Sequence, residues 1–182
     1  FQPTSVCTTL WPVCGAGILH AADAVKAAAM LQPYAVVHEF YNPQTDRYFR
    51  TGDKTAPAIL RTGVIGPWAD TGDHFIAWRQ AQPETVPVCR FYSGRYRAHY
   101  YTGVAQECQA LRANPDWTYE NVAFHAQLPS AGICPGATVP VQRWFSSVAG
   151  DFNFRFIRDL DYGAVLGDRG WSSAGVAFCV EG

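Results

Sequence analysis

The stretch Pro87-Val88-Cys89-Arg90-Phe91-Tyr92 is the strongest indication of the fold, because two other stretches of the chain have the same form. These are Val37-His38-Glu39-Phe40-Tyr41 and Pro140-Val141-Gln142-Arg143-Trp144-Phe145. Each copy continues to a tryptophan, and the three tryptophans (Trp68, Trp117 and Trp171) are separated by roughly 50 residues. A unit of this length cannot bury its apolar face alone. The sequence therefore predicts three units that pack around a shared centre.

Each unit is expected to contain two strands, a short helix and a third strand. The quoted stretches alternate as a first strand, turn residues follow at 42–45, 93–96 and 146–150, and aromatic second strands are expected at 48–51, 99–102 and 153–156. The helix is clearest at 104–112, and the closing strands are 75–78, 122–124 and 176–178. The predicted fold class is β-rich α+β, a pseudo-threefold domain that is trefoil- or propeller-like. Because the tryptophans recur with the closing strands, we expect them in the core.

Two regions are predicted along the chain. Residues 1–33 form an N-terminal segment that contains Cys7, Cys14 and an alanine-rich helix at 20–31, which ends before Pro33. Residues 34–182 form the three-repeat domain, with repeats at about 35–85, 86–138 and 139–182.

Charge and cysteine content narrow the class of protein. The chain has 14 basic and 15 acidic residues, which argues against a nucleic-acid binder that needs a basic stripe. No apolar stretch approaches the ~20 residues of a membrane helix. The chain starts at Phe1 without a leader pattern, so we expect a mature chain whose leader has been removed. Its six cysteines form no C-x-x-C pair, and an even count indicates three disulfides, in any of about fifteen connectivities, in a secreted protein.

Several stretches resemble a bacterial extracellular family known as a domain of unknown function (DUF5648). The resemblance rests on 87–92, His99-Tyr100-Tyr101, Glu107-Cys108 and the run 134–144 that leads to 176–179, and it extends to 39–43 and 46–49 in the first repeat. It implies three tandem copies of a unit with an Asp-His-Phe-Tyr-Thr-like hairpin strand, found as tails on secreted hydrolases. The family histidine is kept as His99, whereas Tyr48 replaces it in the first copy and Asn153 in the third.

Placed on these repeats, the cysteines fall into three pairs. Cys89 on an opening strand is expected to bond Cys108 on the helix of the same repeat, closing a loop worth ~3 kcal/mol. Cys134 is expected to bond Cys179 and enclose the third repeat, which is worth ~4 kcal/mol on the same model. Cys7 and Cys14 form the remaining pair.

Catalytic and metal-binding patterns are weak. The chain has no G-x-S-x-G elbow, no Gly-rich phosphate loop and no spare thiol for a cysteine nucleophile. Asp159 and Asp161 could form a glycosidase-like carboxylate pair, but a solvated turn is the favoured interpretation. His74 and His125 lie on related strands and could bind copper or zinc, although two hydrogen-bonded or exposed histidines are the favoured interpretation. No enzyme activity and no cofactor are expected.

The hairpins carry more aromatic residues than a core of this size needs, and half of an alternating strand faces outward. Exposed rings stack on the C–H faces of sugars, while neighbouring polar groups bond the hydroxyls. The alternative is that these rings seal the contacts between repeats. The predicted ligand-binding residues are Tyr41, Asp46, Tyr48, Tyr92, His99, Tyr101, Asp151 and Asn153.

The sequence thus favours a non-catalytic, lectin-like extracellular module that binds carbohydrate or another cell-surface polymer, as a possible tail or companion of a secreted enzyme. Two other classes stay open. One is a secreted metal-binding protein that uses His74 and His125, and the other is a secreted protease inhibitor.

Overall fold

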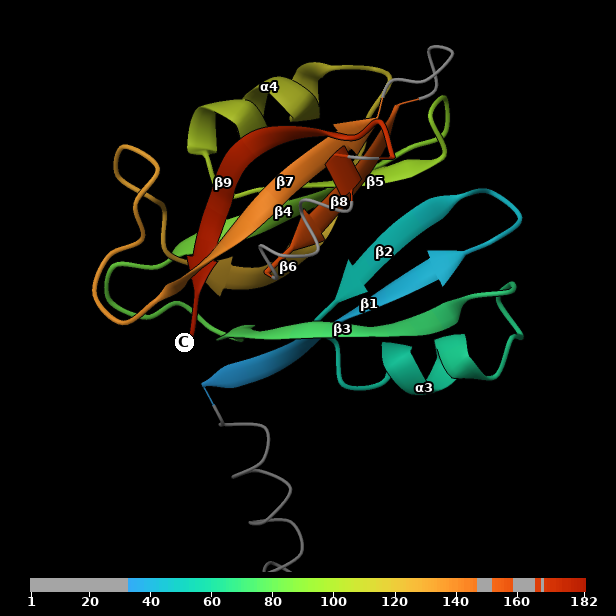
Figure 1. The fold of residues 1–182 in the computed structure, drawn as a ribbon, viewed down its shortest axis with the longest axis horizontal. Helices are drawn as coiled ribbons and strands as arrows, with labels where there is room; N and C mark the ends of the chain where they lie inside the picture. The colour runs from blue at the N-terminus through green and yellow to red at the C-terminus, as the bar shows by residue number, and fades with distance from the viewer. Residues whose placement is uncertain (1–32, 147–151, 159–165, 168) are drawn as a thin grey trace, which may run out of the picture. The chain divides into compact units, whose positions relative to one another are not determined.

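The structure, a computed structural model that describes residues 33–146, 152–158, 166–167 and 169–182, is built from antiparallel three-stranded units (Figure 1). We call each unit a meander, although its first strand and not its second is the central one. Meander 1 consists of β1 (Tyr34–Asn42), β2 (Arg47–Thr51), α3 (Ala56–Arg61) and β3 (Ala69–Trp78). Meander 2 consists of β4 (Val86–Ser93), β5 (Ala98–Thr102), α4 (Ala105–Ala113) and β6 (Thr118–Ala126). Meander 3 contains β7 (Val139–Ser146), β8 (Asn153–Ile157) and β9 (Ser172–Val180). In each meander the first strand lies between the other two. All described residues except Pro33 belong to one unit, Tyr34–Gly182.

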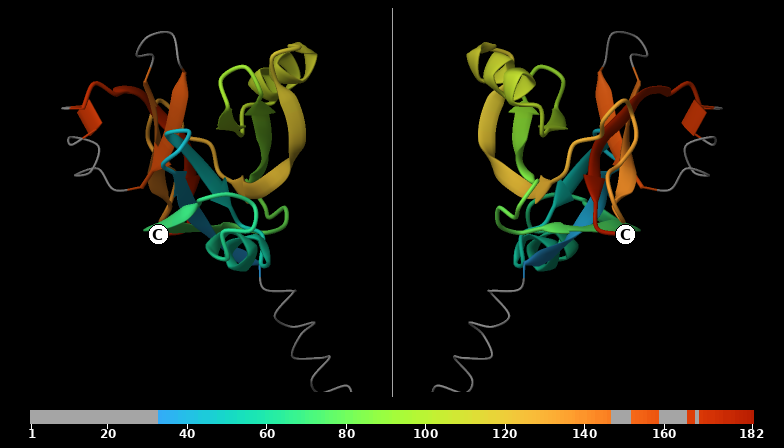
Figure 2. Two further views of the ribbon diagram at one scale, coloured as in Figure 1. Left: turned by 90° about the vertical axis from the view of Figure 1, so that its right-hand side faces the viewer. Right: turned by 90° about the vertical axis from the view of Figure 1, so that its left-hand side faces the viewer.

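The meanders are arranged in two sheets. One has the strand order β2-β1-β3-β6-β4-β5 and the other β8-β7-β9. The six-stranded sheet is continuous through a single cross-strand pair, Trp78 and His125, and it is strongly curved (Figure 2). The β-rich fold class is therefore confirmed. The trefoil- or propeller-like arrangement is not confirmed, because two meanders share one sheet and the third forms its own.

The hairpin turns explain where the first and second strands meet. The side chain of Asn42 accepts hydrogen bonds from the backbone N–H groups of Gln44 and Thr45, at 3.0 and 3.3 Å, which starts the first turn. The turn closes at Asp46, whose φ is +54°, and the second hairpin closes in the same way at Arg97, with φ of +52°. Asp and Arg hold a left-handed conformation that is uncommon outside glycine. Tight turns of this kind fix the pairing of the strands that they join.

The centre of the unit is a triangle of phenylalanines from the third strands. Phe75, Phe124 and Phe178 are at most 2% exposed, and their ring centroids are 5.3–6.0 Å apart. Each is opposite a buried valine of its own first strand: Val37, Val88 and Val141. Edge-to-face contacts at these distances add to the stability from apolar burial. The closing strands β3, β6 and β9 therefore share one core.

The tryptophans expected in the core are only half-buried. Trp68, Trp117 and Trp171 each come directly before a third strand, at the outer end of the meander. Trp68 packs on Phe49 at 5.9 Å, Trp117 on Tyr100 at 5.7 Å, and Trp171 on Tyr48 at 6.0 Å. Their recurrence was informative, but their assignment to the centre was wrong. Each tryptophan packs against a ring on a second strand, and the phenylalanines occupy the centre instead.

Two disulfides close the second and third meanders. Cys89 on β4 bonds Cys108 on α4, and Cys134 bonds Cys179 on β9. They are two of the three pairs expected from the sequence. The Cys7–Cys14 pair and the helix at 20–31 lie outside the described residues. None of the helices in the described part of the chain has the length and apolar character needed to cross a bilayer.

Candidate functional site

The meanders contact one another through the same positions of their hairpins. One side chain on each second strand faces the next meander, and these side chains are Phe49, Tyr100 and Arg155. Each of these side chains contacts the ring at the second position of the second strand in the next meander. Phe49 lies 4.7 Å from His99, Tyr100 lies 4.9 Å from Phe154, and the Arg155 guanidinium lies 4.4 Å from Tyr48. Three junctions of one design result, and we name them 1–2, 2–3 and 3–1.

Junctions 1–2 and 2–3 each hold an arginine over an aromatic ring. Arg90 of β4 lies 4.9 Å from the Phe49 ring centroid, and Arg143 of β7 lies 5.2 Å from that of Tyr100. Such a cation over a ring face is stabilised by the quadrupole of the ring.

At junction 3–1 an acidic residue replaces the arginine of the first strand, and an arginine replaces the ring of the second strand. Glu39 of β1 takes the position of Arg90 and Arg143, and Arg155 of β8 takes the position of the ring. Nε and Nη2 of Arg155 donate to the Glu39 carboxylate at 3.0 and 2.6 Å. Arg50 donates to it at 3.1 Å and the Thr71 hydroxyl at 3.0 Å. Because Glu39 is completely buried, these four bonds compensate for its lost hydration.

A cleft opens above this buried cluster. Its volume is about 520 Å³, and we call it the tyrosine cleft; it is lined by Tyr41, Tyr48, Thr71, Gly72, Asp73, Arg155 and Ile157. The two tyrosines are half-buried, cross-strand neighbours with ring centroids 5.0 Å apart. Tyr41 donates its hydroxyl hydrogen to Asp46 at 3.0 Å. Partial burial, together with this bond to Asp46, raises the pKa of Tyr41 and so favours the neutral hydroxyl that donates to Asp46. The cleft offers ring surface together with hydroxyl, guanidinium and carboxylate groups.

The same ring pair recurs in the second hairpin. Tyr92 and His99 are cross-strand neighbours with rings 5.0 Å apart. In the third hairpin this position is occupied by Phe145 and Phe154. The sequence comparison placed Asn153 at the position of His99, and the strand register shows that this was one residue off. Asn153 corresponds instead to Arg47 and Ala98, at the start of the second strands.

The predicted ligand-binding residues therefore divide into two groups. Tyr41 and Tyr48 line the tyrosine cleft, Asp46 bonds Tyr41, and Tyr92 and His99 form the equivalent pair.

Tyr101 and Asn153 have structural contacts instead of open faces. Tyr101 is 2% exposed, and its hydroxyl donates to the Arg50 carbonyl at 2.7 Å and accepts from the Arg50 N–H at 2.8 Å. Asn153 is buried and donates its amide to the backbone oxygen of Asp46. Neither side chain therefore presents an open face to a ligand in this structure. Asp151 lies outside the described residues.

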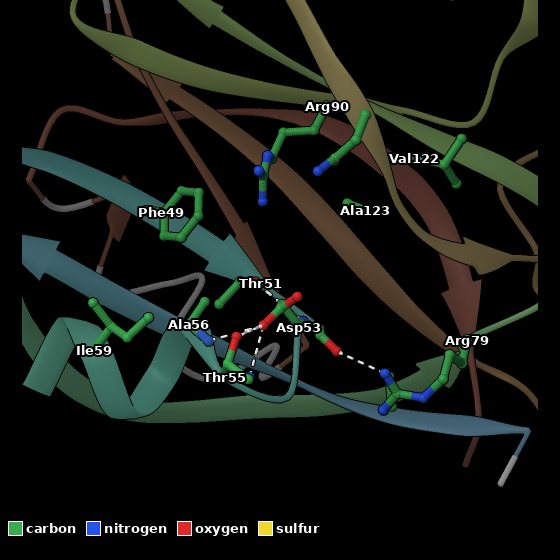
Figure 3. A pocket seen from close by; sticks show the side chains of 13 residues that line it. Phe49, Thr51, Asp53, Thr55, Ala56, Ile59, Arg79, Arg90, Val122 and Ala123 are labelled. Carbon is green, nitrogen blue, oxygen red and sulfur yellow. Dashed lines mark hydrogen bonds between the residues drawn. The ribbon is translucent and has the colours of Figure 1, made fainter. Parts of the chain in front are cut away.

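A second cleft of about 440 Å³ lies at junction 1–2 (Figure 3). We call it the arginine cleft, because Arg90 and Arg79 both line it, with Asp53 between them in the view of Figure 3. Its walls also include Phe49, Thr51, Ile59, Asn121 and Val122. Sequence reasoning missed this cleft. In the sequence only the charged Arg90 within an apolar strand signalled it, and the ring that Arg90 packs on, Phe49, comes from another meander.

The proposed metal ligands do not meet. His74 pairs with His38, whereas His125 pairs with Trp78, four residues further along β3. At a strand rise of about 3.3 Å per residue, the two histidines are separated by about 13 Å along the sheet. Among the described residues no group of three or more His, Cys, Asp or Glu side chains could hold a metal ion. Asp159 and Asp161 are outside the described part of the chain.

Comparison with known proteins gives a family without an assigned activity. The chain matches no curated protein and no solved structure. The family model described as Domain of unknown function (DUF5648) matches residues 20–127, which is more than half of the chain. The chain therefore belongs to the DUF5648 family.

Proposed function

We propose that this chain is a non-catalytic extracellular recognition module that binds carbohydrate or a cell-surface polymer through the tyrosine cleft. The observation that carries the proposal is the Tyr41–Tyr48 pair, whose half-buried rings have centroids 5.0 Å apart. The pair lines the same cleft as the polar groups of Thr71, Asp73 and Arg155. Sugars need apolar ring surface for their C–H faces and mixed donors and acceptors for their hydroxyls. Both kinds of surface line one cleft of a size typical of small-ligand sites.

The electrostatics of the cleft favour binding over acid–base catalysis. Glu39 and Asp73 both accept from Arg50, and Glu39 has no exposed surface. A general acid or base must reach the substrate and exchange a proton with it. A carboxylate that is buried between two guanidinium groups instead supports the position of Arg155 in the cleft wall.

We further propose that the three meanders are copies of one unit in a pseudo-threefold arrangement. Three features support it: a shared strand order, the Phe75–Phe124–Phe178 triangle, and junctions built from equivalent positions. In this view the ring pairs Tyr41–Tyr48 and Tyr92–His99 are related sites, and two weak sites on one rigid unit would gain avidity for a repeating polymer. A role as the targeting tail of a secreted hydrolase fits this binding mode, and the two disulfides are compatible with secretion.

A glycan and cell-wall polymer array tests the function. Wild-type protein is expected to bind a subset of the polymers, and Tyr48→Ala is expected to lose at least about tenfold in affinity, the equivalent of roughly 1.4 kcal/mol. Tyr34→Ala is a matched control. Tyr34 is 41% exposed and lies on the same strand, seven residues from Tyr41 and about 23 Å away along β1. A folded wild-type protein that binds none of the polymers would refute the proposal.

A further inference from the structure

The arginine cleft contains a guanidinium whose outer edge is open. Nε of Arg90 donates to Glu120 at 2.7 Å, and its guanidinium packs on the Phe49 ring. The side chain is 15% exposed, and its two terminal nitrogens have no hydrogen-bond partner among the described residues. Anchored on one edge and stacked on one face, Arg90 presents Nη1 and Nη2 as a fixed pair of donors toward the cleft.

Glu120 keeps this arrangement charged at neutral pH. Its burial works against ionisation, but its interactions with His99 and Arg90 outweigh the burial and lower the pKa of Glu120. The carboxylate therefore remains an anion that holds Nε of Arg90. Such anchoring reduces the conformational entropy that the arginine would lose when it binds a ligand.

The opposite side of the cleft offers a hydrogen-bond acceptor. Oδ1 of Asp53 accepts from the backbone N–H groups of Thr55 and Ala56 and from the Thr55 hydroxyl, at 2.7–2.9 Å (Figure 3). These bonds, led by that of the Thr55 side chain, lower the pKa of Asp53 and keep it ionised. Oδ2 accepts no hydrogen bond from the described residues and is available to a ligand hydroxyl.

A single ligand chemistry fits this set of groups. A guanidinium edge binds a planar pair of oxygens, and a carboxylate provides that pair with bidentate geometry. Asp53 requires a donor on the same ligand, which a hydroxyl group supplies, and the amide of Asn121 bonds either kind of oxygen. Phe49 and Ile59 provide apolar surface for a ring. Carboxylate, hydroxyls and an apolar ring face occur together in a uronic acid unit.

We propose that the arginine cleft is a second saccharide subsite and that it binds the uronate unit of an acidic polysaccharide, with the sugar carboxylate on Arg90. This inference rests on the proposed carbohydrate function and adds the charge of the ligand. It assigns the tyrosine cleft to neutral sugar surface and the arginine cleft to the carboxylate-bearing unit.

Calorimetric titration with a galacturonate oligosaccharide and with its methyl ester tests the subsite, because the ester keeps the sugar ring and its hydroxyls but replaces the charged carboxylate with a neutral methyl ester group. We expect the acid to bind at least about tenfold more tightly than the ester, and we expect Arg90→Gln to remove this preference. Arg95→Gln is the matched control, since Arg95 is 66% exposed in a hairpin turn and pairs with Asp116 at the surface.

Arg90→Gln also removes the arginine that Glu120 pairs with, so a second variant guards against misfolding. Asn121 is exposed and is the cross-strand neighbour of Arg90. Asn121→Asp places a negative charge beside the guanidinium edge and is expected to reverse the preference toward the ester while leaving the thermal unfolding temperature unchanged.

The outcomes separate the two proposals. Equal affinity for acid and ester, or an equal loss in Arg95→Gln and Arg90→Gln, overturns the uronate subsite. If neutral glycans still bind in a Tyr48-dependent manner, the carbohydrate function stands without it.

Discussion

Substitution of Glu39, the buried carboxylate at junction 3–1, should lower the free energy of unfolding more than substitution of most other polar residues of the unit. In Glu39→Gln the side chain keeps its shape but loses the charge that faces Arg50 and Arg155, whose side chains are 3% and 5% exposed. Removal of one partner from a buried ion pair typically costs about 3–5 kcal/mol, because the remaining charges stay desolvated. The whole unit is expected to have a free energy of unfolding of roughly 5–15 kcal/mol. Glu39→Gln should therefore remove a large share of it.

Urea unfolding followed by tryptophan fluorescence measures this loss. With an m-value of about 2 kcal/mol per molar urea, the midpoint should fall by about 2 M. Glu120→Gln is the control, because Glu120 also accepts from an arginine but its side chain is 31% exposed. A partly exposed pair contributes about 1 kcal/mol or less, so the control midpoint should move by at most about 0.5 M.

The double variant Glu39→Gln/Arg155→Gln isolates the pair. Its loss should be smaller than the sum of the two single losses, since the second substitution removes a charge that the first has left poorly compensated. A Glu39→Gln midpoint no lower than that of Glu120→Gln, or strictly additive losses, would refute the argument that junction 3–1 is held by a coupled buried pair.

The two remaining predictions concern the disulfides and pH. Replacing Cys134 and Cys179 by serine should destabilise the protein by about 0.8 kcal/mol more than replacing Cys89 and Cys108. The reason is that the sequence separations are 45 and 19 residues and the loop-closure entropy grows with loop length. Chemical unfolding of both double variants measures the difference, and the reverse order would contradict the prediction. Burial lowers the pKa of His38; Asp70 opposes this lowering, and Arg61 and His74 add to it. Burial also lowers the pKa of His125, and a hydrogen bond with the Arg79 backbone partly offsets that lowering. The unfolded chain therefore binds protons at higher pH than the folded chain, so the unfolding temperature should fall as pH drops through about 6.5. The fall should be smaller in a His38→Asn/His125→Asn variant. An equal fall in that variant would show that these histidines are not its source.

Local pattern determined much of the architecture. Alternating apolar residues in 37–41, 87–92 and 140–145 identified the first strands, and the turn residues after them located the hairpins. Strands joined by a tight turn pair with each other, and in the structure these hairpins place Tyr41 beside Tyr48 and Tyr92 beside His99. The third hairpin was misaligned by one residue, because the length of its turn differs and sequence similarity alone does not set strand register.

The β-rich class, the strands of each meander and the cysteine pairs of the second and third meanders were predictable from the amino-acid sequence, because each depends on periodicity or on positions within one repeat. Which face of each strand meets the next meander depends on the packing of distant segments. The tertiary structure buried Tyr101 against Arg50, separated His74 from His125, and joined Glu39 to Arg155 across 116 residues. Alternation predicts that a side chain faces one side of a sheet, but not which distant chain segment covers that side. The composition of both clefts was therefore decided by packing between meanders.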